Sequence, residues 1–133
     1  MPSSATRTFT DPDTYFAGIR NLQIDGVVTK RGDFRVKSTR IDLHRVWMHR
    51  FDEKLPRIMR ITPSGKRVVI LFATQPHQAE MQVSGIETPQ DQIAVIGSHG
   101  PYYLRSSAAS GWGTMSLTSE DLSAASEAIV GHR

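Results

Sequence analysis

The central part of the chain, from Leu22 to Leu117, shows no helical spacing of apolar residues. Short apolar and β-branched stretches alternate there with turn residues such as Gly32, Pro56 and Gly65. The turn signals recur roughly every 8–12 residues, a spacing typical of antiparallel β proteins. Because no helical stretches separate these segments, the pattern argues against a parallel sheet and favours a sandwich, a jelly roll or a small barrel.

The individual strands are predicted from alternation and from breaks at Gly and Pro. In residues 34–39, Phe34, Val36 and Ser38 alternate with Arg35, Lys37 and Thr39, as expected of a half-buried strand. Residues 68–72 form a continuous apolar run and are expected to be a strand buried on both faces. The other expected strands are 22–29, 41–49, 57–61, 79–83, 86–87, 92–96, 102–105 and 112–117.

A short helix is predicted near the N-terminus. Asp11 can cap its first turn, and Pro12 suits the first helical position. The helix is expected to end near Arg20, with Tyr15, Phe16 and Ile19 together on its apolar face. Residues 1–10 are polar and are expected to be a disordered segment, so that residues 11–133 form a single domain.

A second helix is predicted at the C-terminal end. Thr118 can cap it, with Asp121 three positions further on, and Gly131 can end it. Its apolar face would carry Leu122, Ala125 and Ile129.

The composition excludes several classes of protein. The 133 residues contain no cysteine, which rules out disulfides, a thiolate nucleophile and a cysteine-ligated metal. No apolar run approaches the roughly 18 residues of a membrane span, and the first residues lack the apolar core of a signal peptide. A soluble protein in the cytoplasm is expected by exclusion.

The charge of the chain is distributed unevenly. Residues 30–67 hold 12 of the 16 Lys and Arg against 4 acidic residues, or +8, whereas the rest holds 4 basic and 9 acidic residues, or −5. Such polarity suits an anion, a nucleic acid or an oppositely charged copy of the chain. Because the basic residues alternate with apolar ones at strand spacing, they can equally well solvate the open face of a sheet.

No catalytic or metal-binding group stands out. The five histidines are His44, His49, His77, His99 and His132. His44 and His49 are five residues apart, so in a regular strand they face opposite ways, which disfavours a shared metal. Ser98 and His99 lie in a Gly-rich turn without a third group, and Asp52 and Glu53 are assigned to a charged loop. We therefore expect no enzyme, no metal and no cofactor.

Four stretches together resemble a known family. They are Phe9–Tyr15, Thr39–Arg45, Leu55–Ile58 and Gly111–Leu122, and they span nearly the whole chain in order. The set resembles the N-terminal, cupin-like domain of AraC-type transcription regulators. The resemblance implies a jelly-roll (double-stranded β-helix) barrel that binds a small-molecule effector or mediates homodimerisation.

The chain also departs from that family. The two helix-turn-helix motifs that such regulators carry do not follow within the sequence, which ends at Arg133. The chain would then be either an excised domain or a stand-alone cupin-like protein without metal. Neither predicted helix is basic enough to read DNA, so no direct nucleic-acid binding is expected. The paired histidines of metal-dependent cupins are missing as well.

The resemblance leads to a predicted ligand pocket inside the barrel. Its walls would be Trp47, Met59, Phe72 and Trp112, with Arg45 or His49 as a polar anchor. In a regular strand over 41–49, Arg45, Trp47 and His49 share one face. These residues can also simply fill a core. The glycines on either side of Trp112 indicate a bend or a close approach of another segment.

Two other functions remain open at this point. A barrel that is packed solid would serve as an interaction module, dimerising through the C-terminal helix or the basic sheet face. A stand-alone cupin-like enzyme is the third alternative.

Overall fold

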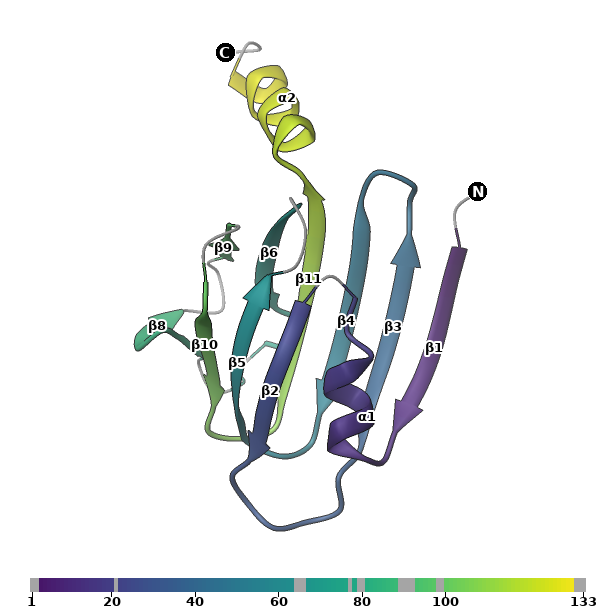
Figure 1. The fold of residues 1–133 in the computed structure, drawn as a ribbon, viewed down its shortest axis with the longest axis vertical. Helices are drawn as coiled ribbons and strands as arrows, with labels where there is room; N and C mark the ends of the chain where they lie inside the picture. The colour runs from purple at the N-terminus through teal and green to yellow at the C-terminus, as the bar shows by residue number, and fades with distance from the viewer. Residues whose placement is uncertain are drawn as a thin grey trace.

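The computed structural model describes residues 3–20, 22–63, 67–76, 78, 81–88, 93–97 and 100–130. The predicted mainly β class is confirmed, since strands far outnumber helices in these ranges (Figure 1). The elements, in chain order, are β1 (Ser3–Phe9), α1 (Pro12–Ala17), β2 (Leu22–Val28), β3 (Val36–Asp42), β4 (Trp47–Glu53), β5 (Arg57–Pro63), β6 (Arg67–Ala73), β7 (Met81–Val83), β8 (Ile86–Thr88), β9 (Ile93–Ile96), β10 (Tyr102–Ser106), β11 (Ser110–Thr118) and α2 (Ser119–Val130).

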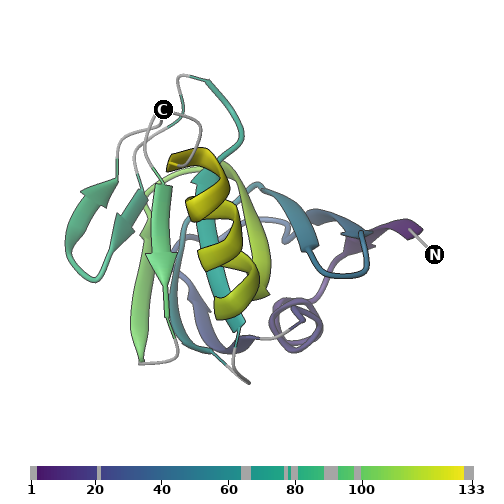
Figure 2. The same cartoon turned by 90° about the horizontal axis from the view of Figure 1, so that it is seen from above.

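The strands form two antiparallel sheets. One has six strands in the order β1-β3-β4-β11-β6-β9, and the other has five in the order β2-β5-β10-β7-β8. The sheets face each other, as the view from above shows (Figure 2). One cluster of buried apolar side chains forms the core. They do not close into a barrel, because each sheet keeps two edge strands among the described residues. The barrel that the resemblance implies is therefore not closed in this part of the chain, and the two antiparallel sheets are compatible with a β-sandwich.

The N-terminal residues belong to the fold. Residues 3–9, which the sequence pattern assigns to a disordered segment, form β1 and pair along their whole length with β3. The side chains of β1 are exposed up to Phe9, so their polarity reflects an edge position in the sheet. Backbone pairing, which a hydropathy pattern does not reveal, orders this segment.

Helix α1 begins where the sequence predicts. Asp11 Oδ2 accepts a hydrogen bond of 2.9 Å from the Thr14 amide, and the helix ends at Gly18, earlier than expected. Its apolar residues Tyr15 and Phe16 are buried, and so is Ile19, which follows the helix. The ring of Phe16 lies directly over Gly26 of β2, where a Cβ atom would come within 2.4 Å of it. Glycine at this position lets the helix approach the sheet.

The predicted strand over residues 41–49 is broken in the structure. The chain turns at residues 43–46, where His44 adopts a positive φ of 72° and its amide donates to Asp42 Oδ1 at 2.9 Å. An Asp side chain that accepts the amide two residues later is a common turn device. Arg45 therefore lies in a turn and does not share a strand face with Trp47 and His49.

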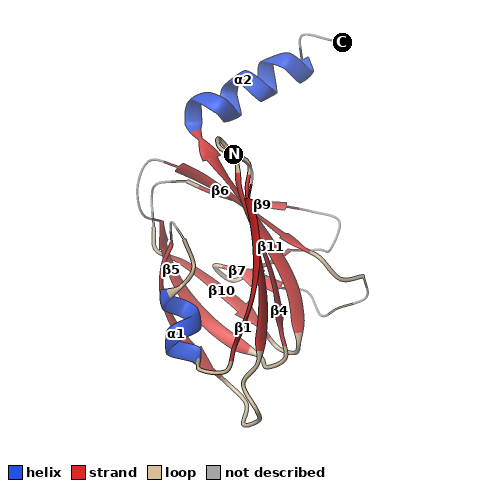
Figure 3. Ribbon diagram, turned by 90° about the vertical axis from the view of Figure 1, so that its right-hand side faces the viewer, coloured by secondary structure: helices blue, strands red, loops and turns tan. Residues whose placement is uncertain are grey.

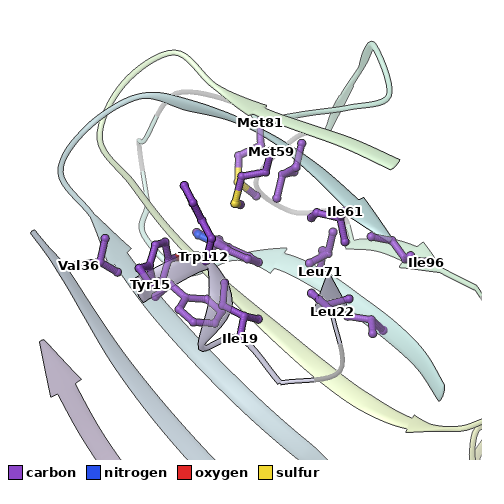
Figure 4. Packing of buried hydrophobic residues seen from close by; sticks show 14 of the residues in the cluster. Tyr15, Ile19, Leu22, Val36, Met59, Ile61, Leu71, Met81, Ile96 and Trp112 are labelled. Carbon is purple, nitrogen blue, oxygen red and sulfur yellow. The ribbon is translucent and has the colours of Figure 1, made fainter. Parts of the chain in front are cut away.

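Alternation within the strands builds the core. Along β4, His49, Phe51 and Glu53 are buried, and along β5, Arg57, Met59 and Ile61 are buried. Trp112 of β11 lies at the centre of the cluster beside Tyr15 (Figure 4). The β6 run, expected to be buried on both faces, has only Val69 and Leu71 fully buried, because its other face is partly open.

Helix α2 follows β11 without a loop. The Thr118 hydroxyl accepts a hydrogen bond of 3.1 Å from the Asp121 amide, which confirms the predicted cap. The helix extends beyond the end of the sheets (Figure 3). The side chains of Ala125 and Ile129, and Gly131 as a whole, lie outside the described residues. Neither of the helices in the described ranges has the length and apolar character needed to cross a membrane.

Candidate functional site

A buried carboxylate joins four elements at the end of the sheets opposite α2. Glu53, the last residue of β4, forms a salt bridge with Arg57, the first residue of β5, with 3.1 Å between Glu53 Oε1 and Arg57 Nε. Both side chains are at most 2% exposed. The Tyr15 hydroxyl of α1 donates to Glu53 Oε2 at 2.9 Å, and the indole N–H of Trp112 donates to the same oxygen. We call these four residues the Glu53 cluster.

The local sequence explains how the cluster forms. Side chains alternate between the two faces of a strand. Glu53 lies on the same inward face of β4 as His49 and Phe51. Arg57 lies on the same inward face of β5 as Met59 and Ile61. Residues 54–56 connect the two strands and bring the acid and the base together. The assignment of Asp52 and Glu53 to a charged loop is therefore wrong, since both belong to β4.

The electrostatics of the cluster are mutually consistent. Burial raises the pKa of the Tyr15 hydroxyl well above its ordinary value, and the negative charge of Glu53 raises it further. The phenol thus stays protonated and acts as a donor. Charge-assisted hydrogen bonds of this kind offset the desolvation of a buried carboxylate.

Three polar atoms beside the cluster have no hydrogen-bond partner among the described residues. They are Arg57 Nη1, Ser106 Oγ and Ser110 Oγ, and all three are buried. The strand register places them close together, because Ser106 is paired with Arg57 and Ser110 with Glu53. Buried polar atoms are normally paired, so this region has unused hydrogen-bonding capacity.

A pocket of about 630 Å³ lies next to these groups. Glu53 and Ser110 form part of its wall, and the remainder comes from outward residues of the six-stranded sheet and from the loops beside them. We call it the β4–β11 pocket. It is lined by Thr8, Arg35, Lys37, Asp52, Glu53, Lys54, Gln75, Gln78, Ala109, Ser110 and Gly111.

Gly111 shapes one side of the pocket. The Thr74 amide donates to the Gly111 carbonyl, and the Gly111 amide donates to Gln78 Oε1, both at 3.0 Å. A Cβ atom on Gly111 would lie 2.5 Å from Thr74 Oγ1 and 2.7 Å from Gln75 Cγ. Gly113 is likewise covered, by the ring of Phe72. The close approaches expected at both glycines are confirmed.

The six residues predicted as ligand-binding are dispersed, and the β4–β11 pocket is lined by none of them. Met59 and Trp112 are fully buried members of the core. Phe72 faces the outer side of its sheet, because Val69 and Leu71 take the inward positions of β6. Arg45 is exposed in its turn, where its Nη1 forms a salt bridge with Asp121 Oδ1 at 3.6 Å.

Trp47 and His49 do share the inward face of β4. Trp47 is stacked between two guanidinium groups, with Arg20 Cζ at 3.4 Å and Arg67 Cζ at 3.6 Å from its ring centroid. Arg20 also pairs with Asp42 at 3.1 Å. This end of the interior is therefore closed by stacked cations, and Trp47 serves as the surface on which they pack.

His49 is buried, and its Nε2 has no hydrogen-bond partner among the described residues. Desolvation, and then the charges of Arg40 and Arg20, lower its pKa to about 4. The imidazole is therefore neutral at pH 7. The histidine expected to anchor a ligand lies edge-on to the ring of Phe51, 5.2 Å between centroids, as part of the packing.

Sequence reasoning missed Glu53, Arg57 and the residues of the pocket. One signal was present: Trp47, His49, Phe51 and Glu53 alternate at even spacing, which places the carboxylate on the inward face. The pocket itself depends on the loop over Gly111; the glycines around Trp112 indicate that a segment approaches closely, but no local pattern shows which segment it is.

Comparisons of the chain with protein-family models, with curated proteins and with solved structures found no match. Across the residues that the structure describes, His, Asp and Glu side chains do not gather in groups of three or more that could hold a metal ion.

Replacing Glu53 by Gln should strongly destabilise the protein. The substitution leaves the Arg57 charge buried without its partner, which typically costs about 3–5 kcal/mol. Asp52→Asn is the matched control, since the neighbouring side chain is partly exposed, and it should cost well under about 1 kcal/mol. Urea unfolding measures both values, and equal effects of the two substitutions would contradict a central role for the cluster.

The free energy of unfolding should decrease as the pH is lowered, because of His49. Its pKa of about 4 in the fold lies below the ordinary value of 6.5, so the unfolded chain binds the proton more readily. The stabilisation is complete above pH 6.5 and is lost as the pH falls towards 4, by up to about 3 kcal/mol in total. His49→Gln should reduce the pH dependence of the free energy of unfolding, measured with urea between pH 7.5 and 4.5. His44→Asn, at an exposed histidine, should leave the slope unchanged, and an unchanged slope in His49→Gln would refute the assignment.

Proposed function

We propose that this chain is the ligand-sensing domain of an AraC-type transcription regulator, with its effector site in the β4–β11 pocket. The observation that carries the proposal is the pocket itself. Its volume of about 630 Å³ suits a metabolite, and its wall joins exposed polar side chains to Glu53, which is fixed in the core. A molecule bound there would contact the exposed side chains of the wall and lie beside the buried Glu53 cluster.

The resemblance to the AraC-type regulators gains support from where its stretches lie. Each partner of Glu53 falls in one of them: Tyr15 in Phe9–Tyr15, Arg57 in Leu55–Ile58 and Trp112 in Gly111–Leu122. The two antiparallel sheets are compatible with a cupin-like jelly roll. In this proposal the protein is cytoplasmic, and DNA is bound through a separate domain.

A small-molecule screen tests the effector site. Ala109 is an exposed residue of the pocket wall, so Ala109→Trp should fill the pocket without removing a charge or a hydrogen bond. Compounds that raise the melting temperature of the wild type should lose this effect in Ala109→Trp. Ala108→Trp, at the exposed neighbour outside the lining, is the matched control and should keep it. A screen without hits, or hits that Ala109→Trp leaves unchanged, would argue against this site.

A second candidate function is self-association, which an apolar row on the outer face of the six-stranded sheet favours. Ile41, Met48, Met115, Ile70 and Val95 are successive register partners across β3, β4, β11, β6 and β9. Val95 is 56% exposed, and the other four are partly exposed. We propose that a second copy of the chain packs on this row, because a surface made of uncharged side chains can pack against the same surface of a copy related by a two-fold axis.

Sedimentation velocity over a range of concentrations tests this candidate. Met115→Lys places a charge at the centre of the row and should weaken the dimer at least about tenfold, since a buried unpaired charge is costly. Ile58→Lys, on the exposed face of the other sheet, is the control and should leave the association unchanged. A wild-type protein that stays monomeric at high concentration would exclude a homodimer.

A further inference from the structure

We propose that the β4–β11 pocket selects a small dianion, either a dicarboxylate or a phosphate monoester; this inference rests on the proposed function of the pocket as an effector site. It begins with the charges of the wall. The charged residues of the lining are Arg35, Lys37, Lys54, Asp52 and Glu53. The three cations are exposed and free to turn towards a ligand.

Glu53 does not oppose an anion. Its carboxylate is neutralised by Arg57, with two hydrogen bonds of 3.1 and 3.3 Å, and accepts further bonds from Tyr15 and Trp112. The pair therefore carries no net charge towards the pocket. Among the described residues that line the pocket, the other charged side chains are three cations and one anion, which gives a net charge of +2.

The remaining acid, Asp52, is itself partly engaged. Its Oδ2 lies 4.0 Å from Arg50 Nε, and its Oδ1 accepts a hydrogen bond of 3.5 Å from Gln75 Nε2. Asp52 is also the outward register partner of Lys37 on β3. The field in the pocket is thus positive, and a ligand with two negative charges would balance it.

A second, independent observation concerns the buried side of the pocket. Ser110 is only 6% exposed, and its Oγ is buried without a hydrogen-bond partner among the described residues, yet the residue lines the pocket. Its Oγ is closed off from solvent in this conformation, so it could donate to an oxygen of an anionic group only once the side chain turns towards the pocket. The exposed cations Arg35, Lys37 and Lys54 supply the donors that a carboxylate or phosphate requires, and the Ser110 hydroxyl is a further donor in reserve.

The size of the site limits the ligand further. A pocket of about 630 Å³ at a sheet end accommodates a metabolite rather than a polymer. Its cations come from the ends of β3 and β4 on one sheet. They surround a compact site, unlike the extended basic groove that a nucleic-acid strand needs.

Binding of defined probes tests the inference. Succinate and glycerol 3-phosphate are the dianions, butyrate is the monoanion and glycerol the neutral probe, each measured by isothermal titration calorimetry at low and moderate salt. At least one dianion should bind about tenfold or more tightly than butyrate, and added salt should weaken it. The preferred dianion then assigns the site to a dicarboxylate or to a phosphate monoester.

Charge variants locate the effect. Lys37→Gln combined with Lys54→Gln should weaken the preferred dianion about tenfold or more, whereas Arg60→Gln, an exposed cation outside the lining, should not. Dianions that bind no better than butyrate, or that the lysine variants leave unaffected, would overturn the inference. If other compounds then still bind in a way that Ala109→Trp abolishes, the effector site stands and only the charge selectivity fails. If nothing binds at all, both fail.

Discussion

The interaction on which the rest of the structure depends is the burial of the Glu53 carboxylate. An ionised carboxyl group cannot be removed from water without partners, and the fold supplies them from α1, β5 and β11. Each donor is correctly placed only when its own element is in register. The N-terminal helix, the β4–β5 connection and the long strand β11 are thereby tied to one position, and the two sheets are joined at this end.

The opposite end of the interior is closed in another way. Trp47 lies between the guanidinium groups of Arg20 and Arg67, so the apolar centre has a hydrogen-bonded acid at one end and a stacked aromatic ring at the other. Between them the core is filled by packed side chains, including Met59 and Trp112. This explains why the candidate site lies at the sheet end and surface, where an interior site was expected.

Much of the fold could be predicted from the sequence. Alternation identified most strands, and the caps at Asp11 and Thr118 placed the starts of both helices, because these signals are local. The failures have two causes. The order of β1 comes from pairing with β3, the turn around His44 from a side chain that binds the backbone, and the pocket from a loop packed over Gly111. The pairing of β1 and the packing over Gly111 join segments that are distant in the sequence and carry no matching pattern. The turn around His44 is local, but the alternation of residues 41–49 hid it, which is why Arg45 was expected in a strand.

The β4–β11 pocket combines one buried acid with several exposed cations, which we call its rim. This arrangement affects how the sequence of such a domain can change in evolution. Substitution at Glu53 disturbs the core, whereas Arg35, Lys37 and Lys54 stand in solvent and can change at little cost to stability. Descendants of one ancestral chain could therefore exchange these exposed side chains, and with them the ligand proposed for the β4–β11 pocket, while retaining the same scaffold. The buried acid would be the constant part of such a lineage and the rim its variable part.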